Sequence, residues 1–225
     1  MPTFNEMQHG YIQRSLPLYQ GQNIELIVVD GGSTDSTQTF LEENNIQFLV
    51  ISDSTRLKRI QKGIELTTGD KIIIHHPRTI LNIPAFDHLL NTKNAWGAFT
   101  HKFDHNHPLL VFTSLYSNFI RGDLRSIFYL DHCFYLDRSL KNKIIGLEDC
   151  EIFEDTEISK TLKNHSKGKR LSEVAQTSAI RFRKNGIFKQ AFLNQKMKWM
   201  YYFNKDHRQM NKEYEKNLEL NNETK

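Results

Sequence analysis

The stretch IELIVVDGGS, residues 24–33, decides the fold of this chain. Its first six residues are aliphatic apart from one glutamate, and two glycines follow Asp30 and interrupt the pattern. Such a run predicts a buried parallel strand over Ile24–Val29 that ends in a turn. The residues Ser33–Thr37 are of the kind that cap helix N-termini, so we expect a helix from there to about Glu43.

Strand and helix patterns alternate after this stretch. We predict strands over residues 47–51 and 71–75, with a helix over 57–66 between them. This alternation indicates βαβ units, and therefore a single α/β domain with a mostly parallel sheet flanked by helices. Ligands bind such sheets at the carboxyl ends of the strands, where Asp30 and the segment 76–78 (HPR) both fall. Later segments are predicted as strands at 95–103 and 127–135 and as helices at 155–162 and 186–202.

The composition fits one intracellular domain with a modest extension, because the chain has 225 residues. Two cysteines, Cys133 and Cys150, are too few for a disulfide framework and lack the paired spacing of a zinc site. The N-terminus has no basic stretch followed by an apolar run, and no segment approaches ~20 consecutive apolar residues. We therefore expect a cytoplasmic protein without a signal peptide or a membrane-spanning helix.

Charge is distributed unevenly along the chain. Residues 1–159 carry 14 Lys and Arg against 20 Asp and Glu, whereas residues 160–225 carry 16 Lys and Arg against 6 Asp and Glu. A basic C-terminal part favours an anionic partner such as phosphate groups or a lipid surface, and no nucleic acid is expected. The alternative is an ordinary solvated basic helix surface.

Short blocks in a fixed order carry a family resemblance: Pro2–Glu6 (PTFNE), Val28–Thr37 (VVDGGSTDST), Arg56–Gly63 (RLKRIQKG), Thr68–Asp70 (TGD), Glu154–Glu157 (EDTE) and Thr177–Phe182 (TSAIRF). Together they resemble family 2 glycosyltransferases of the GT-A fold. Asn118, Asp131 and the segment 206–214 also resemble a small bacterial subgroup of that family. The resemblance implies a GT-A-like domain over residues 1–216, followed by a polar tail over 217–225.

The resemblance also implies an activity. An inverting transferase of the hexosyltransferase type would move a sugar from a nucleotide-diphosphate donor, with UDP preferred, to the hydroxyl of an unknown glycan or lipid-linked acceptor. The alternative is a non-catalytic nucleotide-sugar binding protein of the same fold. The donor side would comprise Pro2, Thr3, Glu6, Asp30, Gly31, Ser33, Arg56 and Arg59.

Individual residues suit these roles. Asp30 at a strand end can accept hydrogen bonds from a uracil or ribose edge, and Thr3 and Glu6 lie on the neighbouring loop. The pair Gly31-Gly32 allows the backbone to approach a ligand closely. Taken alone, this loop favours an ordinary strand–turn–helix cap, because short motifs often occur by chance. The other blocks in their fixed order reverse this preference.

Asp155 is the candidate catalytic base, with Glu154 beside it. A carboxylate must take the proton of the acceptor hydroxyl, and clustered carboxylates raise one another's proton affinity. The alternative is that these acids only complement a helix dipole. A rival acidic pair, Glu148-Asp149, lies just upstream.

Arg78 marks a departure from the family pattern. The family places a metal-binding aspartate at this position, and an arginine has five donors and no acceptor, so it cannot bind Mg²⁺ or Mn²⁺. A guanidinium can instead bind phosphate oxygens directly. We therefore expect Arg78 and His76 on the diphosphate, helped by Arg56 or Arg59, and no residue is assigned to a metal. A metal clip from His101, Asp104, His105 and His107 is a weaker alternative.

On the acceptor side the resemblance points to Asp131, Glu157 and Arg181. The segment 187–203 combines aromatic residues with lysines, so it would suit a peripheral contact with the inner face of an anionic membrane. The alternative, which we weighted more heavily, is that its apolar stripe packs on the sheet.

The start of the chain raises one further expectation. The family has a central apolar strand directly before the block at Pro2, where this sequence has only Met1. Either the native protein is longer, or its sheet lacks a central strand and is unusually unstable.

Overall fold

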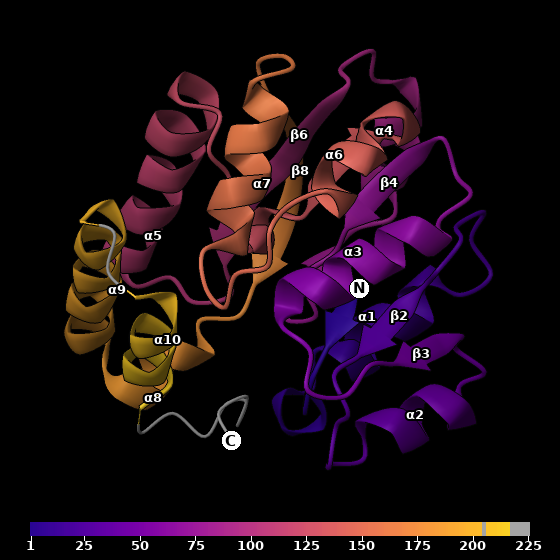
Figure 1. Cartoon of the computed structure of the whole chain (residues 1–225), viewed down its shortest axis with the longest axis horizontal. Helices are drawn as coiled ribbons and strands as arrows, with labels where there is room; N and C mark the ends of the chain where they lie inside the picture. The colour runs from indigo at the N-terminus through magenta and orange to yellow at the C-terminus, as the bar shows by residue number, and fades with distance from the viewer. Residues whose placement is uncertain (204–205, 217–225) are drawn as a thin grey trace.

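The computed structural model describes residues 1–203 and 206–216. Figure 1 shows a smaller β-sheet beside a larger one, with helices packed around both. The helices in the described ranges all fall short of the length and hydropathy that crossing a membrane requires. The predicted tail at 217–225 lies outside the described residues.

The smaller sheet is parallel and carries the N-terminal motifs. Its strands follow the order β1 (Pro2–Thr3), β2 (Val28–Asp30) and β3 (Phe48–Val50). The helices that follow β2 and β3 are α2 (Thr37–Glu43) and α3 (Arg56–Leu66), as the sequence predicted. Buried side chains from α1 (Ile12–Tyr19), β2 and α2 share one apolar core, which includes Ile12, Leu16, Val28 and Leu41.

The strand predicted at Ile24–Val29 is shorter than expected. Strand pairing begins only at Val28, because its partner β1 starts at Pro2. Residues 24–27 lie before the paired residues of β2, and the Ile27 carbonyl accepts from the Met1 amino group at 2.7 Å. A cavity of about 280 Å³ lies there, between residues 23–27 on one side and 69–75 on the other.

The larger sheet is mixed. Its strands follow the order β4 (Lys71–Ile74), β7 (Phe134–Asp137), β6 (Trp96–Phe103), β8 (Lys169–Thr177) and β5 (Thr79–Leu81). Strands β6 and β8 are parallel, and the other neighbours are antiparallel. The α/β class is confirmed, and the antiparallel pairs are a feature that hydrophobic patterning does not reveal.

Most predicted elements after residue 55 are present. Besides α3, the helix α7 (Glu154–Lys163) and the helix α9 (Ile187–Tyr202) match the predicted spans closely. The strand predicted at 127–135 is wrong, because residues 130–132 form a 3₁₀ turn and the strand β7 begins only at Phe134. The remaining elements are η1 (Met7–His9), α4 (Pro84–Asn91), α5 (Pro108–Leu115), η2 (Tyr116–Leu124), η3 (Leu130–His132), η4 (Arg138–Leu140), α6 (Lys141–Ile145), α8 (Ile180–Asn185) and α10 (His207–Glu215).

The helix α9 meets the larger sheet at the end of β6, where its Ile187 and Ala191 pack on the cluster that contains Phe103, in partial agreement with the favoured alternative. It packs against α8 and α10, with Leu193 and Met200 near the buried Met210 of α10. Its residues Phe188 and Phe192 are exposed. These three C-terminal helices form a separate layer at one side of the molecule (Figure 1).

Candidate active site

A cavity of about 240 Å³ opens where the ends of the two sheets meet the C-terminal helices. Eleven of the predicted site residues line it: Pro2, Thr3, Glu6, Arg56, Arg59, His76, Arg78, Asp131, Glu154, Asp155 and Arg181. They come from segments up to 179 residues apart, so the fold gathers most of the predicted site. Four predicted residues do not line the cavity: Asp30, Gly31, Ser33 and Glu157.

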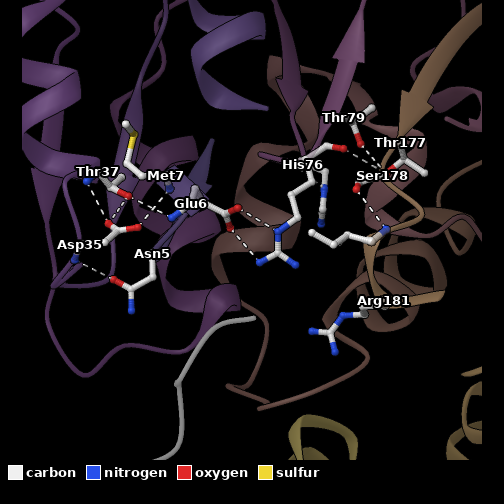
Figure 2. A network of polar contacts seen from close by, with 12 residues as sticks. Asn5, Glu6, Met7, Asp35, Thr37, His76, Thr79, Thr177, Ser178 and Arg181 are labelled. Carbon is white, nitrogen blue, oxygen red and sulfur yellow. Dashed lines mark hydrogen bonds and ion pairs between the residues drawn. The ribbon is translucent and has the colours of Figure 1, made fainter. Parts of the chain in front are cut away.

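The two N-terminal motifs are hydrogen-bonded to each other, as Figure 2 shows. The Oδ1 of Asn5 accepts from the backbone N–H of Thr34 at 2.8 Å, and the backbone N–H of Asn5 donates to Ser33 Oγ at 2.9 Å. The backbone N–H of Glu6 donates to Thr37 Oγ1 at 3.0 Å. The polar residues of the motif therefore fix the backbone of the 5–7 loop, which presents the Glu6 carboxylate to the cavity.

Asp30 also stabilises these N-terminal motifs by hydrogen bonds. Its buried carboxylate accepts hydrogen bonds from Thr3 Oγ1 at 2.9 Å, from both the N–H and the hydroxyl of Ser33 at 2.7 and 2.6 Å, and from the Gly32 N–H and Gln38 Nε2. These donors occupy the carboxylate within the protein. A contact between Asp30 and a base or ribose stays a prediction, and it would require one of these bonds to be exchanged.

Gly31 packs closely against the side chains of Arg59 and Phe4. A β-carbon at this position would lie 2.5 Å from Nη1 of Arg59 and 3.0 Å from the ring of Phe4. The Arg59 guanidinium donates to the Ser54 carbonyl at 2.7 Å and is buried. The absence of a side chain at Gly31 thus leaves room for the Arg59 guanidinium at the edge of the cavity.

Glu6 and Arg78 form a buried ion pair across the cavity wall. Nε and Nη2 of Arg78 donate to the two carboxylate oxygens of Glu6 at 2.9 and 3.2 Å, and the side chains are only 8% and 4% exposed (Figure 2). The Arg78 carbonyl accepts from the Ser178 N–H at 3.0 Å, which ties this loop to the end of β8. The sequence assigned the two residues to different parts of the donor, and the structure brings them into direct contact.

This arrangement does not fit a divalent cation. Such a cation prefers free oxygen ligands, and in the segment between β4 and β5 the side chain that faces Glu6 is the Arg78 guanidinium, which takes both of its carboxylate oxygens. Within residues 1–203 and 206–216 there is no group of three or more His, Cys, Asp or Glu that could hold a metal ion. The residues of the suggested histidine-rich metal site do not face one common point. His101 lies in the cavity wall, whereas Asp104 accepts from the Ala179 N–H at 2.7 Å.

Asp155 and Glu154 begin α7 and face the cavity together. Arg56 Nε lies 2.6 Å from Glu154 Oε1, and that carboxylate is buried. Asp155 accepts from the Leu130 N–H at 3.3 Å and from Thr156 Oγ1 at 3.2 Å. Burial and the neighbouring Glu154 charge raise the pKa of Asp155 to about 7, against the opposing effect of Arg56. A carboxylate with such a pKa can accept a proton near neutral pH.

Phe153 orients this pair by an unusual backbone conformation. Its φ of 66° lies in the left-handed region, which aromatic residues rarely adopt. Its ring packs on that of Tyr201 in α9, with the ring centroids 4.7 Å apart. The contact with α9 therefore stabilises the turn from which the two carboxylates enter the cavity.

Glu157 needs a correction, because the sequence placed it on the acceptor side. It lies one turn further along α7 and faces α9, where it accepts from the Tyr201 hydroxyl and lies 3.2 Å from Lys160 Nζ. The rival acids upstream also lie outside the cavity lining. Asp149 pairs with Lys58 at 3.1 Å, and Glu148 is exposed.

Beside the predicted Arg181, the cavity contains residues that the sequence missed, among them Lys198, Tyr214 and Glu215. Arg181 pairs with Glu215 at 2.5 Å and lies 4.6 Å from the ring centroid of Tyr214. Lys198 of α9 also lines the cavity, and its Nζ lies 5.8 Å from the ring centroid of Tyr129. Burial and the nearby Arg121 lower the pKa of Lys198 to about 8. For Tyr214 the resemblance in the segment 206–214 was a signal, whereas Lys198 and Glu215 lie outside the residues that the resemblance named.

The two histidines at the end of β4 face opposite ways, as strand alternation predicted. His76 lines the cavity, and burial together with the charge of Arg78 lowers its pKa well below the usual value. His75 lies on the other side, where its Nε2 is 2.9 Å from the Tyr19 hydroxyl. Of these two histidines, His76 is therefore the one that can meet a ligand in this cavity.

The raised pKa of Asp155 predicts a pH-dependent cost to stability. Below its ordinary pKa of 3.8 the carboxyl is protonated in both the folded and the unfolded chain, so it costs nothing. Between pH 3.8 and about 7 the unfolded chain loses this proton first, and the folded state is progressively disfavoured. We expect Asp155→Asn to melt at the same temperature as the wild type near pH 4 and a few degrees higher at pH 8. Each kcal/mol of unfolding free energy that the substitution restores should raise the melting temperature by on the order of 2–4 °C. Equal melting temperatures at pH 8 in a thermal scan would contradict the raised pKa.

Comparison with known proteins agrees with this description. Residues 1–76 match the family model described as glycosyl transferase family 2, whereas no curated protein sequence matches the chain. The structure of TarS residues 1–349 from S. aureus superposes with a TM-score of 0.60 at 16% identity, covering 95% of this chain and 68% of that one. The mannosyltransferase PcManGT from Pyrobaculum calidifontis, determined with GDP-Man and Mn²⁺, superposes with a TM-score of 0.58 at 15% identity, covering 87% and 59%.

These likenesses extend over nearly the whole of this chain, although the chain spans only 41% of the longer TarS structure. At such low identities they show the fold. The predicted resemblance is confirmed: the N-terminal third carries the sequence signature of glycosyl transferase family 2, and the chain as a whole has the GT-A fold of the glycosyltransferases TarS and PcManGT.

Proposed function

We propose that this protein is an inverting glycosyltransferase that moves a sugar, of the hexose type, from a nucleotide-diphosphate donor to an acceptor hydroxyl. The observation that carries the proposal is the single cavity that joins a carboxylate of raised pKa, Asp155, to the arginines 56 and 78. A general base and a counter-charge for a diphosphate leaving group are the two requirements of this reaction.

The proposed reaction is one displacement. The acceptor hydroxyl gives its proton to Asp155 while its oxygen forms a bond to the anomeric carbon of the donor sugar. The bond between that carbon and the β-phosphate oxygen breaks, and its electron pair leaves with the nucleoside diphosphate. Attack from the face opposite the leaving group inverts the anomeric configuration.

UDP is the proposed nucleotide. TarS was determined in complex with UDP, and its fold matches with a TM-score of 0.59 over 95% of this chain. The edge of the cavity offers Thr3 of β1, Glu6 of the loop that follows it, and Arg59 of α3. PcManGT was determined with a guanosine nucleotide, so GDP is the natural comparison in a binding test.

A binding protein without turnover is the second candidate. It is favoured by the Glu6–Arg78 pair, because a carboxylate that already neutralises Arg78 reduces the charge offered to a diphosphate. The two functions differ in one measurement. Titration calorimetry with UDP-sugars detects binding in either case. Release of UDP, with the sugar transferred to an acceptor or to water, occurs only if the protein is an enzyme.

We expect the reaction to proceed without a divalent metal. Arg78 takes the position of the metal-binding carboxylate, and the cavity offers guanidinium groups in place of a cation. UDP release should therefore be the same with and without a chelator, and Mn²⁺ should not increase it. A metal-dependent transferase of the same fold serves as the positive control for the chelator. Activity that is abolished by the chelator and restored by Mn²⁺ would refute this role for Arg78.

A further inference from the structure

The helix formed by α5 and η2 has an apolar outer face. Over residues 108–124 its buried side chains are mostly polar and include Ser114, Ser117 and Asn118. Its exposed side chains include Val111, Phe112, Leu115, Tyr116, Phe119 and Ile120, which are between 38% and 64% exposed. This orientation is the reverse of that in an ordinary surface helix, where apolar residues face the core.

The helix α9 repeats this pattern. Its residues Gln190 and Met197 are buried, and Asn194 and Lys198 line the cavity. Its outer side chains Phe188, Phe192, Trp199 and Tyr202 are 59–75% exposed. Both helices thus expose large apolar side chains, although α9 also packs apolar side chains such as Leu193 and Met197 against the protein.

The two helices lie on the same side of the molecule, at the left of Figure 1. The ring of Phe188 at the start of α9 lies 6.0 Å from that of His107, the N-cap of α5. Leu110 of α5 shares a core cluster with Ile187 and Ala191 of α9. We call the exposed apolar side chains of α5–η2 and α9 together the aromatic face. A monomeric soluble protein rarely exposes so many large apolar side chains on neighbouring elements.

The charge around the aromatic face is positive. Arg125 follows the exposed Leu124 at the end of η2, and Lys184 and Lys189 lie on either side of Phe188 in the chain. These three cations are exposed and make no ion pair with another described residue. Two acids of this part of the chain are already paired, Asp123 of η2 with Arg170 and Glu213 of α10 with Lys196 of α9.

We infer that the aromatic face docks on the surface of an anionic lipid bilayer. Phe, Trp and Tyr side chains are favoured at the boundary between headgroups and acyl chains, and lysines and arginines beside them attract anionic headgroups. A second copy of the chain would fit less well. In a symmetric dimer each face meets its own copy, so the same basic rim would approach itself.

Docking in this way gives the bilayer a defined position relative to the cavity. Thr113 and Ser117 line the cavity from the inner side of α5–η2, and Asn194 and Lys198 do so from the inner side of α9. The cavity then lies about one helix diameter, roughly 10 Å, from the lipid surface. If the proposed transferase function holds, an acceptor anchored in that bilayer could reach Asp155 with its polar end.

Vesicle co-sedimentation tests the inference without any donor or acceptor, so its result is independent of the proposed reaction. We expect the wild-type protein to bind vesicles of phosphatidylcholine and phosphatidylglycerol, and to bind pure phosphatidylcholine more weakly. The double variants Phe112→Ser/Phe119→Ser and Phe188→Ser/Phe192→Ser should each lower the affinity by about tenfold or more, because two rings leave the apolar interface.

The matched control is Leu66→Ser/Leu90→Ser, which removes two exposed leucines from α3 and α4 and should leave binding unchanged. All replaced side chains are exposed, so the folded state should persist, and circular dichroism checks it. Equal vesicle binding by the phenylalanine variants and the wild type would overturn the inference. So would a wild-type protein that ignores both vesicles but forms a dimer that these variants dissociate.

Discussion

Replacement of Asp155 by asparagine is expected to lower the rate of sugar transfer by about 10²–10⁴-fold, the usual contribution of a positioned base. Asparagine keeps the shape of the side chain, and its amide oxygen can still accept from the Leu130 N–H, as the carboxylate does at 3.3 Å. It cannot take the proton of the acceptor hydroxyl. Donor affinity, which does not depend on this proton, should change little.

The pH profile distinguishes a base from a structural residue. Because burial and Glu154 raise the pKa of Asp155 to about 7, the fraction of ionised base, and with it the wild-type rate, should rise with pH through about 7. The residual rate of Asp155→Asn should lack this rise. Asp149→Asn is the matched control, since Asp149 is an exposed acid paired with Lys58 outside the cavity. A wild-type profile that persists unchanged in Asp155→Asn would rule out Asp155 as the base.

The local parts of this site could be predicted from the sequence. An aliphatic run that ends in Asp30 and two glycines predicts a strand and a turn, and the structure has both. The acids at 154 and 155 begin a helix, as their position before a helical pattern suggested. Each of these predictions depends on residues within a few positions of one another, which periodicity and capping preferences describe well.

The parts that depend on distant residues could not be predicted. Glu6 and Arg78 are 72 residues apart, and their ion pair exists only because β1 and β4 end at the same cavity. Asp30 has a side chain and a position that suit ligand binding, yet its carboxylate already accepts hydrogen bonds from residues of the neighbouring loops. The aliphatic run at 24–29 is only partly a strand, because pairing requires a partner that patterning within the run does not reveal.

The surface of the C-terminal part illustrates the same limit. Hydrophobic residues in helices normally face a core, so the apolar positions of 187–203 suggested packing, and no prediction was made for 108–124. The exposed side chains of Phe112 and Phe192 show that these positions face outward. Periodicity identifies which residues share a helix face, and only the packing of the other helices determines whether that face is covered.

The Glu6–Arg78 pair gives the second large prediction. We expect Glu6→Gln to lower the free energy of unfolding by about 3–5 kcal/mol, because it removes the charge of one partner from a buried bidentate ion pair. Both side chains are less than a tenth exposed, so water compensates little for the loss. Glu6→Gln/Arg78→Met should recover much of this stability, because neither charge of the pair is then buried. Urea unfolding of the two variants and of Arg78→Met completes the double-mutant cycle.

Donor binding by the same variants tests whether Arg78 serves the diphosphate. In the wild type the Glu6 carboxylate and a diphosphate compete for one guanidinium, which can present its paired N–H groups to only one of them. Removing the carboxylate charge should therefore tighten UDP binding in Glu6→Gln, measured by calorimetry well below its melting temperature, while Arg78→Met should weaken it. If Glu6 instead binds the nucleotide directly and Arg78 only holds Glu6 in place, both variants should weaken UDP binding. Opposite shifts in affinity from the two halves of one ion pair are thus the result that assigns Arg78 to the leaving group.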